Sequence, residues 1–262
     1  PSPILPLSPP ANSRLNSTVL GHITTMLWTR SAIFFTGMTL SAIAFCPIAL
    51  LARPLPPIMR MRVIGLWARF ITGWLALTCN LRHEVIGLEQ LPGVASVILS
   101  KHQSAWETIA FQTIFPAQTW ALKKEALWIP FFGWGLAATH PIAINRAARH
   151  RALGDLLGQG INRLAEGRYV VIFPEGTRMA PGESGVYFPG GAMLAVKAGV
   201  PVIPVAHNAG LFWPRRGFIK RPGTIRVSIG APIMTEGKKA RAINDHARQW
   251  IETEATRLLE QP

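Results

Sequence analysis

Short apolar runs alternate with helical stretches from residue 82 onward, and this alternation constrains the fold more than any other feature of the chain. Six runs have the length and composition of buried strands: residues 96–100, 119–122, 141–144, 169–173, 202–205 and 224–229. Four stretches have helical spacing: residues 105–114, 151–166, 191–198 and 239–259. The alternation predicts an α/β domain over residues 82–262, with a mostly parallel central sheet covered by helices.

The N-terminal part has a different character from this domain. Residues 31–51 read SAIFFTGMTLSAIAFCPIALL, an uncharged run just long enough to span the hydrocarbon core of a bilayer. Arginines flank the run on both sides, so charge gives no orientation, and a helix pair that dips into one leaflet fits at least as well as a span. Residues 1–20 are rich in Pro, Ser and Asn and are predicted to be a disordered leader.

The segment after the uncharged run has the pattern of an amphipathic helix. Its apolar residues follow helical spacing: Val63, Leu66, Trp67, Phe70, Ile71, Trp74 and Leu75. Arg62 and Arg69 fall on the opposite face. Two interpretations are open, a helix at a lipid interface and a helix packed on the protein's own core. We expect residues 21–81 to form a membrane-attached helical pair in front of the α/β domain.

The charge balance points to anionic partners. The 262 residues include 27 basic and 13 acidic side chains, a net charge of +14, so a membrane surface, nucleic acid or a phosphorylated substrate would be attracted. Residues 184–235 contain no acid, and five basic residues cluster there: Arg215, Arg216, Lys220, Arg221 and Arg226. These bases lack the interleaved aromatic residues of a nucleic-acid surface, so no nucleic-acid partner is predicted. Cys46 and Cys79 lie in apolar stretches without metal-type spacing, which predicts buried thiols and no metal site.

One candidate for chemistry lies where the first predicted strand of the domain ends. The stretch LSKHQSAWETIAF (99–111) places His102 after the strand and Glu107 on the first turn of a helix. A neutral imidazole can take the proton of a hydroxyl that attacks an acyl carbon, and a carboxylate can hold its tautomer and stabilise the imidazolium. Alone this spacing is a weak signal, because seven histidines and 13 acids give many chance pairs.

Three further stretches carry candidate binding residues. In VVIFPEGTRM (170–179) a buried strand ends before Pro174, and Gly176 permits a sharp turn that displays Glu175 and Arg178, whose guanidinium suits a phosphate. The stretch PIAINRAARH (141–150) places Arg146 after another strand, where phosphate binding and a solvated helix start are equally good interpretations. The stretch AGVPVIPVAHNAG (198–210) is expected to be framework and pocket wall.

Together these stretches resemble the four motifs of the glycerolipid acyltransferases. The matching residues are His102-Gln-Ser-Ala-Trp-Glu107, Ile144-Asn-Arg146, Phe173-Pro-Glu-Gly-Thr-Arg178 and Val200-Pro-Val-Ile-Pro204. The chain is similar to the bacterial 1-acylglycerol-3-phosphate acyltransferases (lysophosphatidic acid acyltransferases) over roughly residues 80–235, in motif order and approximate spacing. The hexapeptide is the specific element, and the histidine motif becomes convincing beside it.

The resemblance implies transfer of a fatty acyl group from a thioester to the sn-2 hydroxyl of 1-acyl-sn-glycerol 3-phosphate, giving phosphatidic acid. It implies His102 as general base and Glu107 as its orienting acid. The acceptor and its phosphate would be held by five residues: Arg146, Glu175, Gly176, Thr177 and Arg178. The implied donor is acyl carrier protein or coenzyme A carrying the acyl group, with no cofactor or metal ion. The implied location is the inner (cytoplasmic) membrane of a bacterium, with membrane lipids as partners and the active site facing the cytoplasm.

Three departures from the family pattern keep alternatives open. Glu107 replaces the usual aspartate, Asn145 replaces an aspartate that is common before the arginine, and a lysine often found near residues 187–191 is absent. The same chemistry on another lysolipid, such as a lyso-ornithine lipid, is therefore an alternative. A non-catalytic basic membrane-binding protein is a second alternative, although simple binding does not require the combined motifs.

Overall fold

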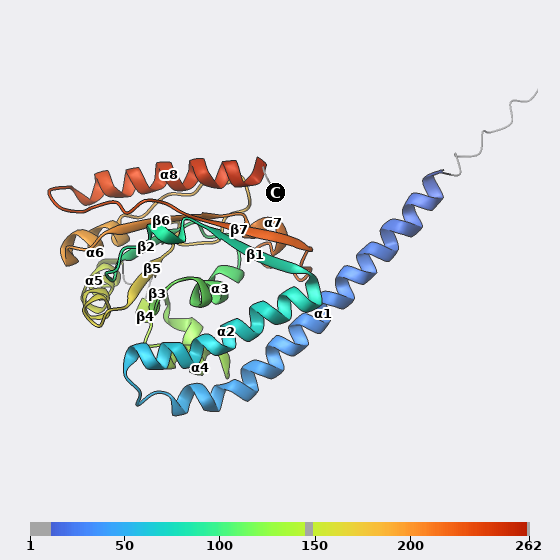
Figure 1. Ribbon diagram of the computed structural model, residues 1–262, viewed down its shortest axis with the longest axis horizontal. Coiled ribbons are helices and arrows are strands. Elements are labelled where there is room, and N and C mark those ends of the chain that lie inside the picture. Colours follow the sequence, from blue (N-terminus) through green and yellow to red (C-terminus); the bar gives the residue numbers. More distant parts are fainter. Residues whose placement is uncertain (1–11, 145–148, 261–262) are drawn as a thin grey trace, which may run out of the picture.

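The computed structural model describes residues 12–144 and 149–260, arranged around a seven-stranded sheet (Figure 1). The strands are β1 (Leu81–Ile86), β2 (Val97–Ser100), β3 (Gln118–Lys123), β4 (Ile142–Ile144), β5 (Tyr169–Ile172), β6 (Val202–His207) and β7 (Gly223–Ile229). Their order is β1-β7-β6-β2-β5-β3-β4. The pair β6–β7 is antiparallel and the other five neighbouring pairs are parallel. The predicted α/β class with a mostly parallel sheet is confirmed.

Helices cover both faces of this sheet. They are α1 (Asn12–Leu51), α2 (Pro57–Cys79), α3 (Trp106–Ile114), α4 (Phe132–Ala138), α5 (Arg149–Ala165), α6 (Gly190–Ala198), α7 (Ala209–Phe212) and α8 (Ala240–Glu260), with short 3-10 helices η1 (Leu88–Gln90) and η2 (Lys124–Trp128). Alternate strand residues face opposite sides. Ile98 and Val171 pack with α2 and α3, whereas Leu99 and Ile172 pack with α5, α6 and α8.

The N-terminal helix begins earlier than the sequence suggested. Residues 1–11 lie outside the described residues, and α1 starts at Asn12, inside the leader of residues 1–20 expected from the sequence. The physical reason lies in the prolines, which cannot sit inside a helix without removing a hydrogen bond. The prolines of the first 20 residues all lie at or before Pro10, so none breaks the helix beyond it.

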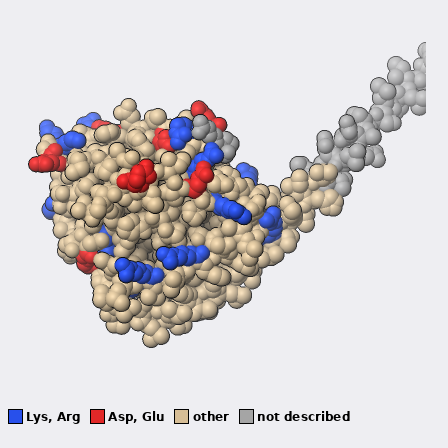
Figure 2. All heavy atoms as spheres, viewed as in Figure 1, with Lys and Arg blue, Asp and Glu red and all other residues tan. Residues whose placement is uncertain are grey.

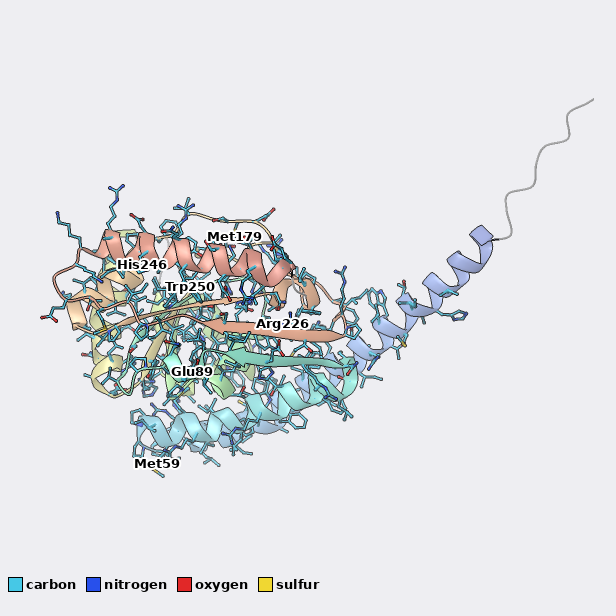
Figure 3. The ribbon with its side chains drawn as sticks, turned by 45° about the horizontal axis from the view of Figure 1, so that its top comes forward. Met59, Glu89, Met179, Arg226, His246 and Trp250 are labelled. Carbon is cyan, nitrogen blue, oxygen red and sulfur yellow. The ribbon has the colours of Figure 1, made fainter. Side chains whose placement is uncertain are left out.

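Helix α2 combines the two interpretations that the sequence left open. One face is buried against α1, α3 and the sheet through residues that include Trp67, Ile71 and Leu75. Its outer face still exposes large apolar side chains, among them Leu66 and Phe70. Met59 likewise points away from the body of the protein (Figure 3). The helix therefore packs on the core with one face. Its outer face exposes Leu66 and Phe70 beside Arg62 and Arg69, so the expectation that these arginines lie opposite Leu66 and Phe70 is wrong: residues four apart share a helix face.

Strand β1 was not predicted, and its composition explains why. The sequence LRHEVI has exposed positions at every second residue, because β1 lies at the edge of the sheet and pairs only with β7. Because polar residues interrupt the sequence of β1, it lacks the continuous apolar run that is typical of the central strands. The boundary expected between residues 81 and 82 falls inside this strand.

The sheet order brings two of the sequence motifs together. Strands β2 and β5 are parallel neighbours, with Leu99 opposite Ile172. Because their carboxyl ends lie at the same edge, the loop that carries His102 and the loop that carries Glu175 leave the sheet side by side.

Candidate active site

His102 and Glu107 are in direct contact. Nδ1 of His102 lies 2.7 Å from Oε1 of Glu107, and the histidine side chain is partly exposed while the carboxylate is buried. A carboxylate can only accept, so Nδ1 carries the proton. The other ring nitrogen, Nε2, is then a free base. This is the arrangement expected of a general base with its orienting acid.

The carboxylate of Glu107 also closes the start of helix α3. Oε1 accepts the backbone N–H groups of Gln103 at 2.9 Å and Ser104 at 2.8 Å. Burial by itself would raise the pKa of Glu107, but the hydrogen bond and charge of His102 and the backbone donor of Ser104 act in the opposite direction, and the pKa is lowered overall. Glu107 therefore stays ionised and can stabilise an imidazolium at His102.

The loop after β5 contacts the ring, the backbone N–H and the backbone carbonyl of His102. The ring of Phe173 stacks on the imidazole, with centroids 4.0 Å apart and planes 15° apart. Oε2 of Glu175 accepts the backbone N–H of His102 at 3.1 Å, and the N–H of Met179 donates to the carbonyl of His102 at 2.7 Å. The loop after β5 thus fixes the backbone and the ring plane of the base. This explains why the two motifs occur together.

Both carboxylate oxygens of Glu175 accept hydrogen bonds from the protein itself. It is buried, its Oε1 accepts from Nζ of Lys101 at 2.7 Å, and its Oε2 is used by His102. A carboxylate whose two oxygens face protein donors is poorly placed to bind a substrate. We therefore propose that Glu175 positions His102, in place of the substrate contact expected from the sequence.

His207 contacts the backbone of the loop that carries His102. Its Nε2 lies 2.9 Å from the carbonyl oxygen of Lys101, and its Nδ1 accepts the N–H of Ala209, so Nε2 carries the proton. Burial lowers the pKa of His207, which keeps the ring neutral. The sequence assigned the stretch that contains this residue to framework and pocket wall, and the structure places His207 at the end of β6 with a contact to the residue before the base.

Three other predicted binding residues follow Glu175 on the hexapeptide loop: Gly176, Thr177 and Arg178. Gly176 has φ +67°, which a residue with a side chain rarely adopts, and it makes the turn after Glu175. Thr177 is exposed and Arg178 is partly buried. Arg146 and Asn145 lie outside the described residues.

A cavity of about 330 Å³ lies between α1 and the hexapeptide loop. Its lining combines apolar and cationic side chains: Phe35, Met38, Ala105, Arg178, Trp213, Pro214, Arg216, Gly217 and Phe218. Ala105 belongs to the turn between His102 and Glu107. The lining contains no carboxylate, so the cavity suits a ligand with an anionic group and an apolar chain.

Sequence reasoning missed three groups that shape the site. Lys101 is buried beside His102, Glu252 reaches it from α8, and Arg216 shares the cavity with Arg178. Lys101 carried a local signal, as a charged residue between an apolar strand and the histidine. Arg216 was singled out only as a member of the basic cluster, without a place in the site. Glu252 comes from a segment distant in sequence, and no local pattern identifies it. Within the described residues, no group of three or more His, Cys, Asp or Glu is placed to hold a metal ion.

A mostly parallel α/β domain with an imidazole–carboxylate pair beside an amphiphilic cavity defines a hydroxyl-activating transferase. Residues 82–208 match the family model named Acyltransferase. A 1-acyl-sn-glycerol-3-phosphate acyltransferase of Pseudomonas aeruginosa is 43% identical over 85% of this chain and 88% of that protein. One from Saccharomyces cerevisiae is 29% identical over 66% of this chain and 58% of that protein.

The fold has a solved counterpart. The crystal structure of the 1-acyl-sn-glycerophosphate (LPA) acyltransferase PlsC from Thermotoga maritima matches with a TM-score of 0.74 at 21% identity, over 88% of this chain and 95% of that one. The chain belongs to the family of the 1-acyl-sn-glycerol-3-phosphate acyltransferases, as its motifs suggested.

Proposed function

We propose that the protein transfers a fatty acyl group from a thioester to the sn-2 hydroxyl of 1-acyl-sn-glycerol 3-phosphate and so produces phosphatidic acid. The observation that carries the proposal is the 2.7 Å contact between His102 and Glu107, which leaves Nε2 of His102 as a base, while Ala105 of the same turn lines an amphiphilic cavity. The 43% identity to a protein named for this activity supports it.

His102 acts as the general base in this reaction. Nε2 takes the proton of the acceptor hydroxyl as the hydroxyl oxygen attacks the thioester carbonyl carbon. The carbon–sulfur bond then breaks, and the imidazolium returns the proton to the leaving thiolate. Glu107 stabilises the imidazolium between these two proton transfers. The products are the ester and the free thiol.

The cavity next to Ala105 is our candidate for the acceptor site. Arg178 lies on the hexapeptide loop and Arg216 on the loop before β7, and Nη1 of Arg215 donates to the carbonyl of Arg178 at 3.0 Å, which joins the two loops. Arg216 has φ +59°, a conformation that costs a non-glycine residue about 1–2 kcal/mol. Such strain is found where a side chain must face a ligand. Two guanidinium groups would hold the phosphate, and Phe35 and Met38 of α1 would contact the acyl chain.

The basic cluster expected at the surface is smaller than the sequence suggested. Lys220 is buried among aromatic rings, and Arg226 pairs with Glu84. With Arg216 assigned to the acceptor cavity, Arg215 and Arg221 remain as candidates to contact an anionic donor. Acyl carrier protein and acyl-coenzyme A both fit this charge, and the two donors are distinguished by the assay below.

The protein attaches to a membrane through its N-terminal helices, in our proposal on the cytoplasmic side of a bacterial inner membrane. Residues Gly21–Leu51 are long and apolar enough to cross a bilayer, and few residues of the most apolar window are buried in the protein. Where α1 leaves the body, the atoms drawn in tan, blue or red include few charged side chains (Figure 2). Residues 30–51, however, pack along α2, with Nε of Arg30 donating to the carbonyl of Thr78 at 2.6 Å. This packing favours a helix pair that enters one leaflet.

Purified protein in detergent tests the proposed reaction directly. We expect transfer to lysophosphatidic acid from at least one of the two thioester donors. His102→Ala should lower that rate about 10²–10⁴-fold without loss of folding or vesicle binding. Transfer only to a different lysolipid would identify another acceptor, and near-normal activity of His102→Ala would exclude His102 as the base.

A further inference from the structure

A chain of ionic hydrogen bonds connects the C-terminal helix to the backbone of His102. Oε1 and Oε2 of Glu252, on α8, lie 2.8 and 3.0 Å from Nζ of Lys101. Nζ of Lys101 also donates to Oε1 of Glu175 at 2.7 Å, and Oε2 of Glu175 accepts the N–H of His102. Glu252, which lies 150 positions after His102 in the chain, thus acts on the backbone of His102 through two charged contacts, Glu252–Lys101 and Lys101–Glu175.

All three donors of the buried ammonium are used. Lys101 is 1% exposed, and besides the two carboxylates it donates to the carbonyl oxygen of Glu183 at 2.7 Å. A buried charge is tolerated only when it is paired and hydrogen-bonded in this way. The hydroxyl of Tyr187 donates to Oε1 of Glu252 at 2.7 Å, and burial raises the pKa of Tyr187, so this donor keeps its proton. The geometry of the network is therefore strongly determined.

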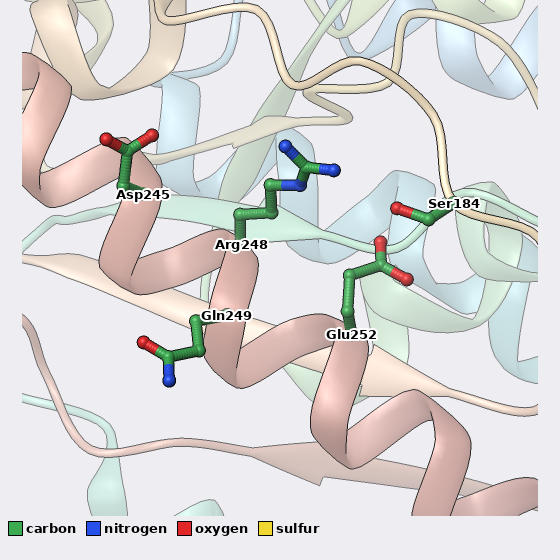
Figure 4. Close-up of a pocket in the computed structure, with 5 residues that line it drawn as sticks. All are labelled: Ser184, Asp245, Arg248, Gln249 and Glu252. Atoms are coloured by element: carbon green, nitrogen blue, oxygen red, sulfur yellow. The ribbon is translucent and has the colours of Figure 1, made fainter.

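The outer end of the network lies at the protein surface. Glu252 is about one quarter exposed and lines a hollow of about 410 Å³ together with Ser184, Asp245, Arg248 and Gln249 (Figure 4). The inner end is fully buried at Glu175. A change at Glu252 therefore perturbs the charged network without removing apolar core residues.

We propose that Lys101 and Glu252 are positioning residues for His102. Glu252 fixes the ammonium of Lys101, the ammonium orients the carboxylate of Glu175, and that carboxylate holds the N–H of His102. A displacement of this backbone by a fraction of an ångström alters the approach of Nε2 to the acceptor hydroxyl. The proposal rests on the proposed acyl transfer, because it assigns these residues a part in placing its general base.

Glu252→Gln tests this role, with Glu254→Gln as the matched control on the same helix. Glu254 pairs with Arg257 and lies outside the network. We expect kcat to fall about 10-fold in Glu252→Gln, within the roughly 10²-fold that a 1 Å misplacement can cost. KM for both substrates and the thermal midpoint should stay close to the wild-type values. Glu252→Asp should recover part of the rate, and Glu254→Gln should keep nearly all of it.

Hydrogen exchange of the peptide that contains residues 99–104 gives a readout that does not need activity. We expect faster exchange in Glu252→Gln than in Glu254→Gln, because Lys101 is then held less firmly and so fixes less well the Glu175 carboxylate that accepts the N–H of His102. Equal exchange in the two variants, or a kcat loss matched by a KM change or by a lower thermal midpoint, would overturn the positioning role. An inactive wild-type protein with the expected exchange difference would contradict the proposed function and leave the positioning role supported.

Discussion

The ammonium nitrogen of Lys220 lies 3.8 Å from the centre of the Phe35 ring, so a buried cation before β7 contacts the N-terminal helix α1. The same nitrogen lies 4.5 Å from the Trp213 ring centre and donates to the carbonyl of Phe218 at 2.7 Å. The backbone N–H of Lys220 donates to Oγ of Ser31. These contacts attach α1 to the loop that carries Arg216, and so they shape one wall of the acceptor cavity.

The burial of Lys220 predicts a pH dependence of stability. Burial lowers the pKa of Lys220 from 10.5 to about 8. Between these values the unfolded chain binds a proton that the folded protein has released, so stability rises with pH there. Relative to Lys220→Met, the wild-type free energy of unfolding should increase by about 1–3 kcal/mol from pH 8 to pH 10.5. Urea unfolding of both proteins in one detergent measures this difference.

The free energy of unfolding rises with pH in this range only if folding destabilises the charged form of Lys220. Below about pH 8 both states are protonated and the burial cost is fully present. A difference between wild type and Lys220→Met that stays flat across this range would show that the folded protein does not release the proton. A difference that falls with pH would mean that the aromatic rings stabilise the charge more than burial destabilises it.

Lys220 also shows that a cluster of basic residues in the sequence does not by itself identify a basic surface. Five basic residues without a neighbouring acid predicted a basic surface cluster, but one of them is enclosed by rings from α1 and from its own loop. The partners of Lys220 in α1 are separated from it by about 185 residues in sequence, so no local pattern signals its burial. The central strands, by contrast, were predicted because each has a continuous apolar run.

The chemistry at Glu107 predicts an order among its variants. Glu107→Asp keeps the charge that stabilises the imidazolium, whereas Glu107→Gln removes it. We expect Glu107→Asp to retain activity within about 10-fold of wild type and Glu107→Gln to lose roughly 10²-fold or more in kcat, as for the orienting acids of related triads. Steady-state kinetics at fixed pH checks the order. Equal activities of the two variants would remove Glu107 from the orienting role.

The His102–Glu107 contact could be predicted because both residues belong to one turn of chain. A strand end followed by a helix start brings side chains five residues apart to the same place, and the structure has them in contact. The role of Glu175 could not be read in the same way. Its sequence neighbours suggested a displayed loop residue, yet Lys101 and His102 of another loop occupy its carboxylate. Contacts between loops depend on strand order, which local patterns do not determine.

The outer face of α2 predicts how the protein binds lipid. Leu66, Phe70 and Leu77 are 50–74% exposed on a helix whose other face is packed on the core. Large apolar side chains are also exposed on η2 and α4, including Trp128, Phe132 and Trp134. Changing Leu66, Phe70 and Leu77 together to Gln should weaken sedimentation with anionic vesicles at least about 10-fold, since each side chain contributes about 1.5–3 kcal/mol when fully buried.

A matched triple variant controls for the general effect of polar substitution. Leu88, Val94 and Val186 are similarly exposed on other parts of the body, and their change to Gln should leave vesicle binding nearly intact. Deletion of residues 1–80 is a poorer test, because it removes Trp67, Ile71 and Leu75 from the core. Equal loss of vesicle binding in the two triple variants would contradict a lipid-facing role for α2.

The two arginines of the cavity predict selectivity for the acceptor. If Arg178 and Arg216 hold the phosphate monoester, each charge-assisted bond is worth about 1.5–3 kcal/mol, roughly 10–100-fold in kcat/KM. Arg178→Ala and Arg216→Ala should each reduce kcat/KM for lysophosphatidic acid by this factor, with a smaller effect on a zwitterionic lysolipid. Arg178→Lys should recover only part of the loss, because lysine keeps the charge but not the planar fork.

Arg241→Ala provides the control for loss of one positive charge. Arg241 lies on α8 with its side chain 93% exposed, far along the chain from the cavity loops, so its removal should change kcat/KM little for either acceptor. The ratio of kcat/KM for lysophosphatidic acid to that for the zwitterionic lysolipid is the deciding quantity. A ratio that falls in both cavity variants and not in Arg241→Ala assigns the phosphate to this cavity. A uniform loss for both acceptors would place Arg178 and Arg216 in a structural or donor-binding role, because a missing phosphate contact cannot affect an acceptor that never made it.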